Sequence, residues 1–87
     1  MKLNENFALR SIAGTWVVLP LADKTVNFNG IIKLNDSGVL LWRALENGAD
    51  RETLADTLTN EYDVTRETAL ADVDEFLNNL RKIGCIE

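Results

Sequence analysis

Hydrophobic and polar positions change their period once along the chain, from that of strands to that of helices. Two segments, Phe7–Ser11 and Thr15–Leu19, alternate apolar with polar residues or are rich in β-branched and aromatic side chains, so both are predicted strands. Ala13-Gly14 between them predicts a tight hairpin turn. Pro20 ends the second strand because proline has no amide hydrogen to give to a ladder.

A third short strand is predicted over Ile31–Leu34, after a connection from Leu21 to Gly30 that is rich in turn formers. That connection contains one candidate strand piece, Thr25–Phe28. A small sheet must have an edge, and an edge strand exposes amides and carbonyls that can pair with another chain. Lys33 is the only charge on the third strand that would discourage such pairing. Strand addition by an extended peptide is therefore physically open.

Apolar residues then recur at helical spacing in three segments joined by short turns. Their expected caps are Asn35 or Asp36 and Gly48 for the first, Asp50 for the second, and Thr65 and Gly84 for the third. Their apolar stripes are Leu41, Trp42 and Leu45; Leu54, Ala55, Leu58 and Tyr62; and Ala69, Leu70, Val73, Phe76, Leu77, Leu80 and Ile83. We expect Trp16 to join Trp42 in the core. The order predicts an α+β fold of the winged helix-turn-helix-like class, with an N-terminal three-stranded antiparallel sheet followed by three helices.

Length and charge narrow the function. The chain has 87 residues, so we expect a single domain over 1–87 with one core. Its net charge of -5 opposes binding to a phosphate backbone or an anionic membrane. No apolar run is long enough for a signal peptide or a bilayer span, and one cysteine cannot form an internal disulfide, so a cytoplasmic location is expected.

The residues that most enzymes use are missing. There is no histidine, and Cys85 lacks the neighbours of a redox pair or a zinc site, so it is expected to pack as a small apolar residue. The five glycines form no phosphate-binding frame. Asp72, Asp74 and Glu75 crowd one stretch, but helical geometry turns them apart, which favours a solvated face over a cation site. We expect no catalysis, no metal and no cofactor.

The order of several segments resembles the PqqD family, the peptide-binding RiPP recognition elements. The resemblance is best from Gly30 to Ile86. It rests on LNDSGVLLW, on the turn EYDV, and on DVDEFLNNLRKIG, in that order and spacing. The segment before the third strand, DKTVNFNG, is longer than in the founding pyrroloquinoline-quinone members, which argues against a role in making that cofactor.

The resemblance implies a noncatalytic domain that binds the leader segment of a ribosomally made precursor peptide in natural product biosynthesis. It would present that leader to a modifying enzyme, often a radical-SAM maturase. In the family the leader adds to the third strand and lies against the third helix. Nothing in the sequence decides between a monomer and a homodimer.

Helical phase describes the surface of the last helix, and only the resemblance says which side faces a groove. One flank of its apolar stripe holds Asp72, Phe76, Asn79 and Ile83, and the opposite flank holds Leu70 and Arg81. The implied peptide-binding residues are Ile31, Ile32, Lys33 and Leu34 on the strand and Asp72, Phe76, Asn79 and Ile83 on the helix. In the simpler alternative, Phe76 and Ile83 close the core and the two polar residues are merely solvated.

Two other functions remain as alternatives. A winged-helix DNA-binding protein would share the layout, but the last helix has three basic residues against four acidic ones and no outward arginine cluster. A generic protein-protein adaptor, or a homodimer paired through its edge strands, is compatible with the same pattern.

Overall fold

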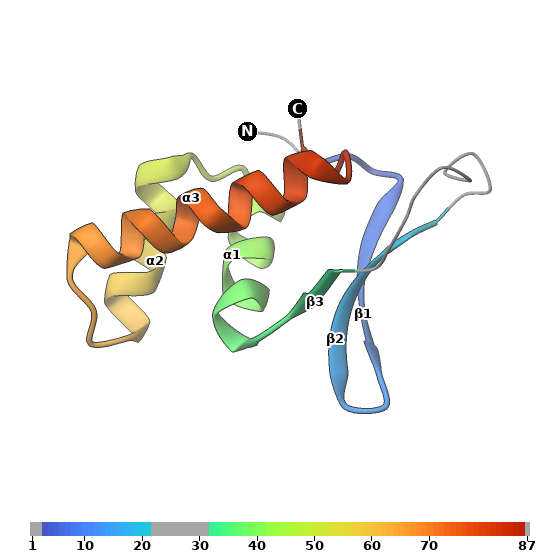
Figure 1. The fold of residues 1–87 in the computed structure, drawn as a ribbon, viewed down its shortest axis with the longest axis horizontal. Helices are drawn as coiled ribbons and strands as arrows, with labels where there is room; N and C mark the ends of the chain where they lie inside the picture. Colours follow the sequence, from blue (N-terminus) through green and yellow to red (C-terminus); the bar gives the residue numbers. More distant parts are fainter. Residues whose placement is uncertain (1–2, 22–31, 87) are drawn as a thin grey trace.

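The computed structural model describes residues 3–21 and 32–86 (Figure 1). Its elements are β1 (Phe7–Ile12), β2 (Thr15–Pro20), β3 (Ile32–Leu34), α1 (Asp36–Glu46), α2 (Arg51–Glu61) and α3 (Arg66–Lys82). The predicted α+β order, three strands followed by three helices, is confirmed. The predicted strand piece Thr25–Phe28 and the first residue of the predicted third strand, Ile31, lie outside the described residues.

The sheet is antiparallel, with the strand order β1-β2-β3. The turn between β1 and β2 has positive φ at both central residues, 51° at Ala13 and 80° at Gly14. This is the backbone of a type I′ turn, whose twist matches that of the strands it joins. It pairs Ile12 with Thr15 and so sets the register of the whole hairpin.

Each helix begins at a side chain that accepts a hydrogen bond from a backbone N–H of the first turn. The acceptors are Asn35 in α1, Asp50 in α2 and Thr65 in α3. Asn35, rather than Asp36, is thus the N-cap of α1. Each cap satisfies an amide that the helix itself leaves without a partner.

The end of α3 is a Schellman motif. Gly84 adopts a φ of 82°, and its N–H donates to the Arg81 carbonyl at 3.1 Å. The N–H of Cys85 donates to the Leu80 carbonyl at 2.9 Å, and both of these side chains are buried. The glycine predicted to stop the helix therefore also turns Cys85 into the core.

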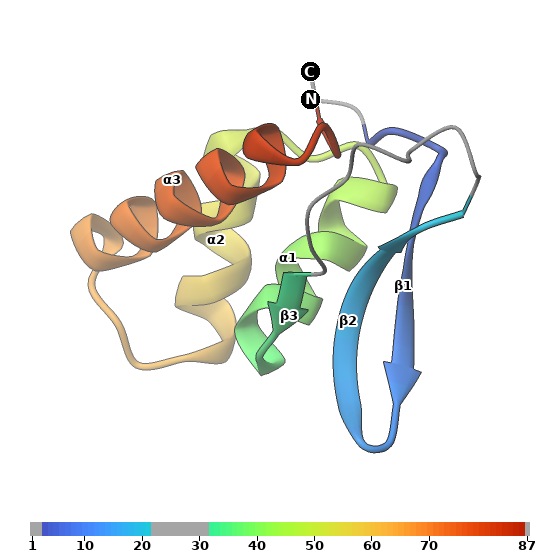
Figure 2. The ribbon, with the colours of Figure 1, turned by 45° about the vertical axis from the view of Figure 1, so that its right-hand side comes forward.

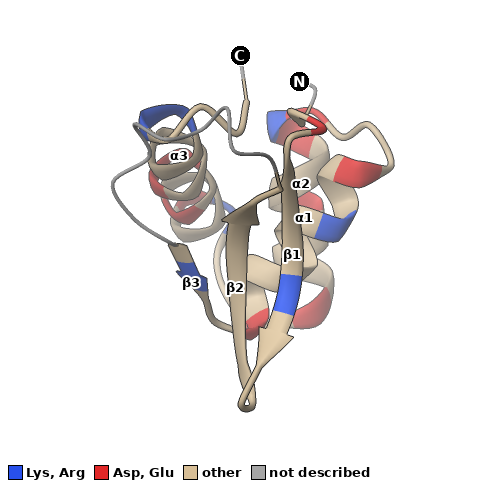
Figure 3. Cartoon of the chain, turned by 90° about the vertical axis from the view of Figure 1, so that its right-hand side faces the viewer, with Lys and Arg blue, Asp and Glu red and all other residues tan. Residues whose placement is uncertain are grey.

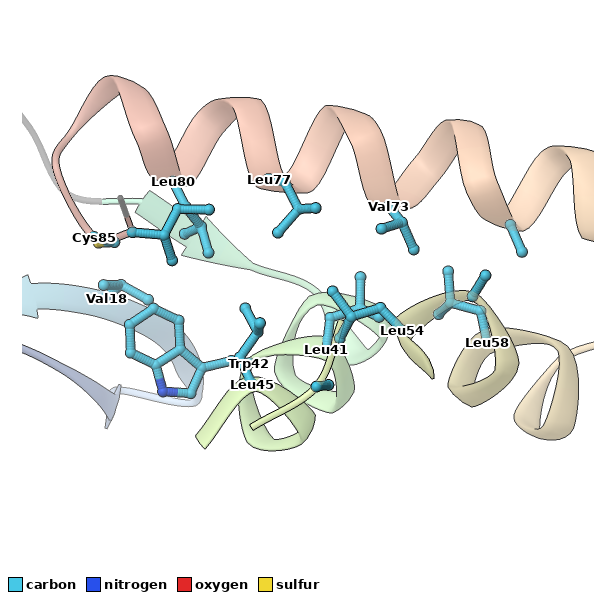
Figure 4. Packing of buried hydrophobic residues seen from close by; sticks show 14 of the residues in the cluster. Val18, Leu41, Trp42, Leu45, Leu54, Leu58, Val73, Leu77, Leu80 and Cys85 are labelled. Atoms are coloured by element: carbon cyan, nitrogen blue, oxygen red, sulfur yellow. The ribbon is translucent and has the colours of Figure 1, made fainter. Parts of the chain in front are cut away.

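The core lies between α3 on one side and the sheet with α1 and α2 on the other (Figure 4). Trp42 is only 2% exposed and packs among leucines and valines from all of these elements, as its helical spacing predicts. The expectation for Trp16 is wrong. It is half-buried outside the core cluster, with the Arg43 guanidinium 5.4 Å from its ring centroid. It pairs with Ser11 of β1 and Leu34 of β3, close to the hairpin turn.

Ion pairs and main-chain contacts hold α3 in place. Arg51 of α2 donates from Nε and Nη2 to the two carboxylate oxygens of Asp74, at 2.7 and 2.9 Å. Arg66 at the start of α3 contacts Asp56 and Glu52 of α2. At the other end of α3, an isolated bridge between Leu3 and Ile86 brings the chain ends together (Figure 1). The helix is thus fixed to α2 along one side, which leaves its other side facing β3.

Candidate functional site

A groove lies between β3 and α3, beside the N-terminal turn of α1. In Figures 2 and 3, α3 runs above β3 on the same side of the molecule. The groove has a volume of about 580 Å³. Its lining residues are Ile32, Lys33, Leu34, Asn35, Ser37, Gly38, Leu41, Leu58, Asp72, Glu75, Phe76, Asn79 and Leu80.

The groove has an apolar floor and a polar rim. Leu41, Leu58 and Leu80 are buried core residues that form the floor. Half-buried apolar residues from β3 and Phe76 from α3 pack against the same core and form the walls. The rim carries the acidic residues of α3 opposite Lys33. An apolar floor with a few polar groups around it is the usual composition of a binding pocket.

The register of the sheet determines which backbone groups of β3 face the groove. Leu21 N–H donates to the Asn6 carbonyl at 2.7 Å, which extends the β1–β2 ladder beyond its last pair. Because hydrogen-bonding direction alternates along a strand, every second residue of β2, counted from Leu21 back to Thr15, directs its N–H and C=O toward β1. The residues between them, Trp16 and Val18, direct theirs toward β3.

The same alternation continues into β3. Trp16 pairs with Leu34 and Val18 pairs with Ile32, so these two residues of β3 bond to β2. Lys33 lies between them and directs its N–H and C=O to the outer edge. No strand of residues 3–21 or 32–86 pairs with that edge.

Gly38 allows α1 to begin directly against β3. A Cβ atom at this position would lie 3.2 Å from Leu34 Cβ and 3.3 Å from Asn35 Oδ1. Both distances are shorter than ordinary van der Waals contact, so a side chain here would displace Leu34 or the cap. The glycine therefore positions the end of β3 relative to the helix that follows it.

Most of the sequence-predicted site residues come together in this groove. The ones that line it are Ile32, Lys33, Leu34, Asp72, Phe76 and Asn79. Ile83 does not line it. It is the C-cap residue of α3, half-buried against the core, because the helix ends at Lys82. The competing flank, Leu70 and Arg81, is absent from the lining.

Sequence reasoning missed Glu75 and the start of α1 as parts of the groove. Glu75 lies beside Asp72 on the rim, whereas Asp74 turns to the far side and binds Arg51. Successive helical residues differ by roughly 100°, so residues 72 and 74 point nearly opposite ways. That bond from Arg51 lowers the pKa of the Asp74 carboxyl below its ordinary value. In the sequence, the Asn35 cap follows directly after the third strand. This was the signal that the start of α1 would lie beside the groove.

Three further features of the described residues concern metal ligands, the thiol and the length of the helices. They contain no group of three or more His, Cys, Asp or Glu side chains placed to hold a metal ion. Burial raises the pKa of the Cys85 thiol to about 12, which keeps it protonated and unreactive at neutral pH. None of the helices described is long and apolar enough to cross a membrane.

Comparison with known proteins identifies the family. The family described as coenzyme PQQ synthesis protein D (PqqD) matches residues 15–86, which include β2, β3 and all three helices. The chain belongs to the PqqD family. The matched segment contains every residue that lines the groove. None of the curated protein sequences is significantly similar to the chain.

Two solved structures share the fold. TbiB1 in complex with the TbiA(beta) leader peptide is 26% identical, with a TM-score of 0.74 over 100% of both chains. A lasso peptide synthetase B1 complexed with the leader peptide is 24% identical and has a TM-score of 0.76. That match covers 97% of this chain and 93% of the other. The PqqD fold found here is therefore shared along nearly its whole length with proteins whose structures contain a leader peptide.

Proposed function

We propose that this PqqD-family protein is a noncatalytic RiPP recognition element. It binds the leader segment of a ribosomally made precursor peptide by strand addition to β3. It then presents the precursor to a modifying enzyme such as a radical-SAM maturase. The observation that carries the proposal is the groove in which the outward edge of β3 faces α3 across an apolar floor. The leader-peptide complexes of the two related structures support the class of ligand.

Lys33 supplies the main-chain contacts in this proposal. Its N–H and C=O face outward, so a residue of a peptide that adds antiparallel to β3 can exchange two hydrogen bonds with it. In water these groups bond to solvent, and the peptide replaces that solvent. Main-chain bonds of this kind contribute affinity without selecting a sequence, so the selection must come from side chains.

Register also predicts which peptide side chains enter the groove. Paired residues on neighbouring strands place their side chains on the same face of a sheet. The peptide residues opposite Ile32 and Leu34 therefore direct theirs to the core side, over the apolar floor and against Phe76. The residue opposite Lys33 directs its side chain to the other face. The expected ligand has two apolar residues separated by one residue of any type.

The chemistry of the chain supports a binding role. Histidine is absent from the sequence, and the single thiol is buried. The groove carries carboxylates and amides on its rim. Carboxylates and amides in this arrangement can orient a peptide, and the covalent step belongs to the partner enzyme. A cytoplasmic location, where precursor peptides are made, is part of the same proposal.

A displayed library of random peptides, long enough to cover β3 and α3, provides the test. The purified protein should enrich peptides with the apolar-any-apolar pattern. N-methylation of the middle residue should abolish binding, because its N–H bonds to the Lys33 carbonyl. N-methylation of either flanking residue, whose N–H points away from β3, should be tolerated. If no peptide is enriched, or if binding ignores the position of the methyl group, the proposal is wrong.

A further inference from the structure

We infer that the groove continues past the end of β3 into a second apolar pocket, which takes one bulky apolar side chain of the same peptide. This inference rests on the proposed function and specifies its sequence requirement. The second pocket has a volume of about 360 Å³, toward the small end of ligand pockets, which span roughly 300–1,000 Å³. Its lining residues are Asn35, Asp36, Ser37, Leu58, Tyr62, Val64 and Asp72.

The two pockets form one continuous surface. Four residues line both of them, Asn35, Ser37, Leu58 and Asp72. Leu58 is buried and lines both pockets, so the apolar floor continues from one pocket into the other. A peptide that leaves the edge of β3 at Leu34 therefore meets the second pocket next, between the start of α1 and the turn from α2 to α3.

Two exposed apolar residues of that turn give the second pocket its character. Tyr62 is 38% exposed and Val64 is 36% exposed, and large hydrophobic residues elsewhere in the described chain are mostly more buried. Exposed apolar groups that gather at a pocket mark a contact site more often than scattered ones do. Here both lie on the wall of one pocket that opens from the proposed peptide groove.

Main-chain hydrogen bonds fix the backbone of the turn at these two residues. The N–H of Tyr62 donates to the Leu58 carbonyl at 2.9 Å, and the N–H of Val64 donates to the Tyr62 carbonyl at 2.9 Å. Tyr62 has extended backbone angles, which end α2 at Glu61. A wall positioned by main-chain bonds needs little reordering when a ligand arrives, and that favours affinity.

The connection of the second pocket to the groove and the charge at its rim indicate which peptide side chain it binds. Asp36 and Asp72 stand at the rim, and no basic residue lines this pocket, so an acidic side chain would be repelled. The apolar wall and floor would bury an aliphatic or aromatic side chain. We therefore expect leaders to carry a third anchor, a large apolar residue just beyond the segment that pairs with β3 on the Leu34 side.

The test repeats the library selection with variants of the turn. Tyr62→Ser and Val64→Ser, made separately, should lose enrichment at the third anchor and keep the apolar-any-apolar pattern. A peptide selected by the parent protein should bind each variant about tenfold more weakly, a loss of roughly 1.4 kcal/mol. Tyr62→Phe should bind like the parent because it keeps the ring. Ile12→Ser is the matched control, since Ile12 is 53% exposed at the hairpin, away from both pockets.

The outcomes separate this inference from the proposed function. If the parent enriches the two-anchor pattern without a third anchor, or if both serine variants select the same peptides as the parent, the second pocket is not used. If the parent enriches no peptide at all, the proposed function fails and the inference fails with it. Thermal unfolding followed by circular dichroism identifies any variant that does not fold, and the other serine variant then decides.

Discussion

Lys33→Pro is expected to abolish most peptide binding while leaving the fold nearly unchanged. The N–H of Lys33 points away from β2, so proline removes no bond from the sheet. Proline is tolerated at such edge positions, and the residue before it is already in a strand, as proline prefers. The free energy of unfolding should change by no more than about 1 kcal/mol.

The loss of affinity can be estimated from the bonds involved. The proline ring removes the donor that faces the peptide and leaves one peptide carbonyl against it without a partner. Losing a hydrogen bond and leaving a desolvated acceptor costs about 1.5 to 3 kcal/mol. That corresponds to an affinity roughly ten- to a hundredfold weaker. Fluorescence anisotropy with a labelled peptide from the library selection measures it directly.

Lys33→Ala is the matched control. It removes the ammonium group and keeps the amide, so binding should stay close to that of the parent protein. Chemical denaturation of both variants separates changes in stability from changes in binding. If Lys33→Pro folds and binds as tightly as Lys33→Ala, the peptide does not pair with this edge, and the reasoning from register is refuted.

Four further predictions concern the groove wall, the thiol, the ion pairs and nucleic acid. Asp72→Lys and Asn79→Lys should each weaken peptide binding about tenfold with changes in stability of about half a kcal/mol. Arg81→Glu on the other flank should not change peptide binding. If anisotropy titrations show that Arg81→Glu weakens binding and the two lysine variants do not, the peptide lies against the other flank of α3. Cys85 should resist alkylation at neutral pH, and its contribution to stability, fully present below pH 9.0, should disappear as the pH rises toward about 12 in denaturation curves. The bond from Arg51 lowers the pKa of the Asp74 carboxyl in the folded protein, so the ionised carboxylate stabilises the fold above pH 3.8, its ordinary pKa. This stabilisation is lost as the pH falls through the lower pKa of the folded state. If Asp74→Asn leaves the loss of stability at acid pH unchanged, this prediction is wrong. Random duplex DNA should not bind at low salt, because the net charge of -5 offers no counterion release; tight binding in a gel shift would show otherwise.

Local signals in the sequence predicted the order of the elements and the caps of α2 and α3, although α2 ends at Glu61, before Tyr62, and α3 ends at Lys82, before Ile83. Asp50 and Thr65 act on amides within their own first turn, and Gly84 provides a conformation that other residues rarely adopt. Such effects depend on a few neighbouring residues. They are therefore visible in a sequence before any tertiary contact is known.

The composition of the groove depended on contacts that the sequence does not display. In the sequence, Glu75 is indistinguishable from a solvated helical residue. The structure shows that Asp74 pairs with Arg51 of α2, which turns Glu75 toward the groove. Trp16 was expected in the core from its strand pattern, but near the hairpin turn it is only half-buried, outside the core cluster and beside Arg43 of α1. Helical phase gave both flanks of α3, and tertiary packing places Asp72, Phe76 and Asn79 of one flank along the groove.

Isotope-edited NOE spectroscopy of the labelled protein with an unlabelled selected peptide tests the central claim most directly. The account predicts cross-strand NOEs between peptide backbone protons and the backbone of β3 around Lys33. It also predicts NOEs from peptide side chains to Phe76 and, for the third anchor, to Tyr62. NOEs confined to β1, or to the surface around Leu3 and Glu5, would contradict strand addition at β3 and place the peptide elsewhere on the molecule.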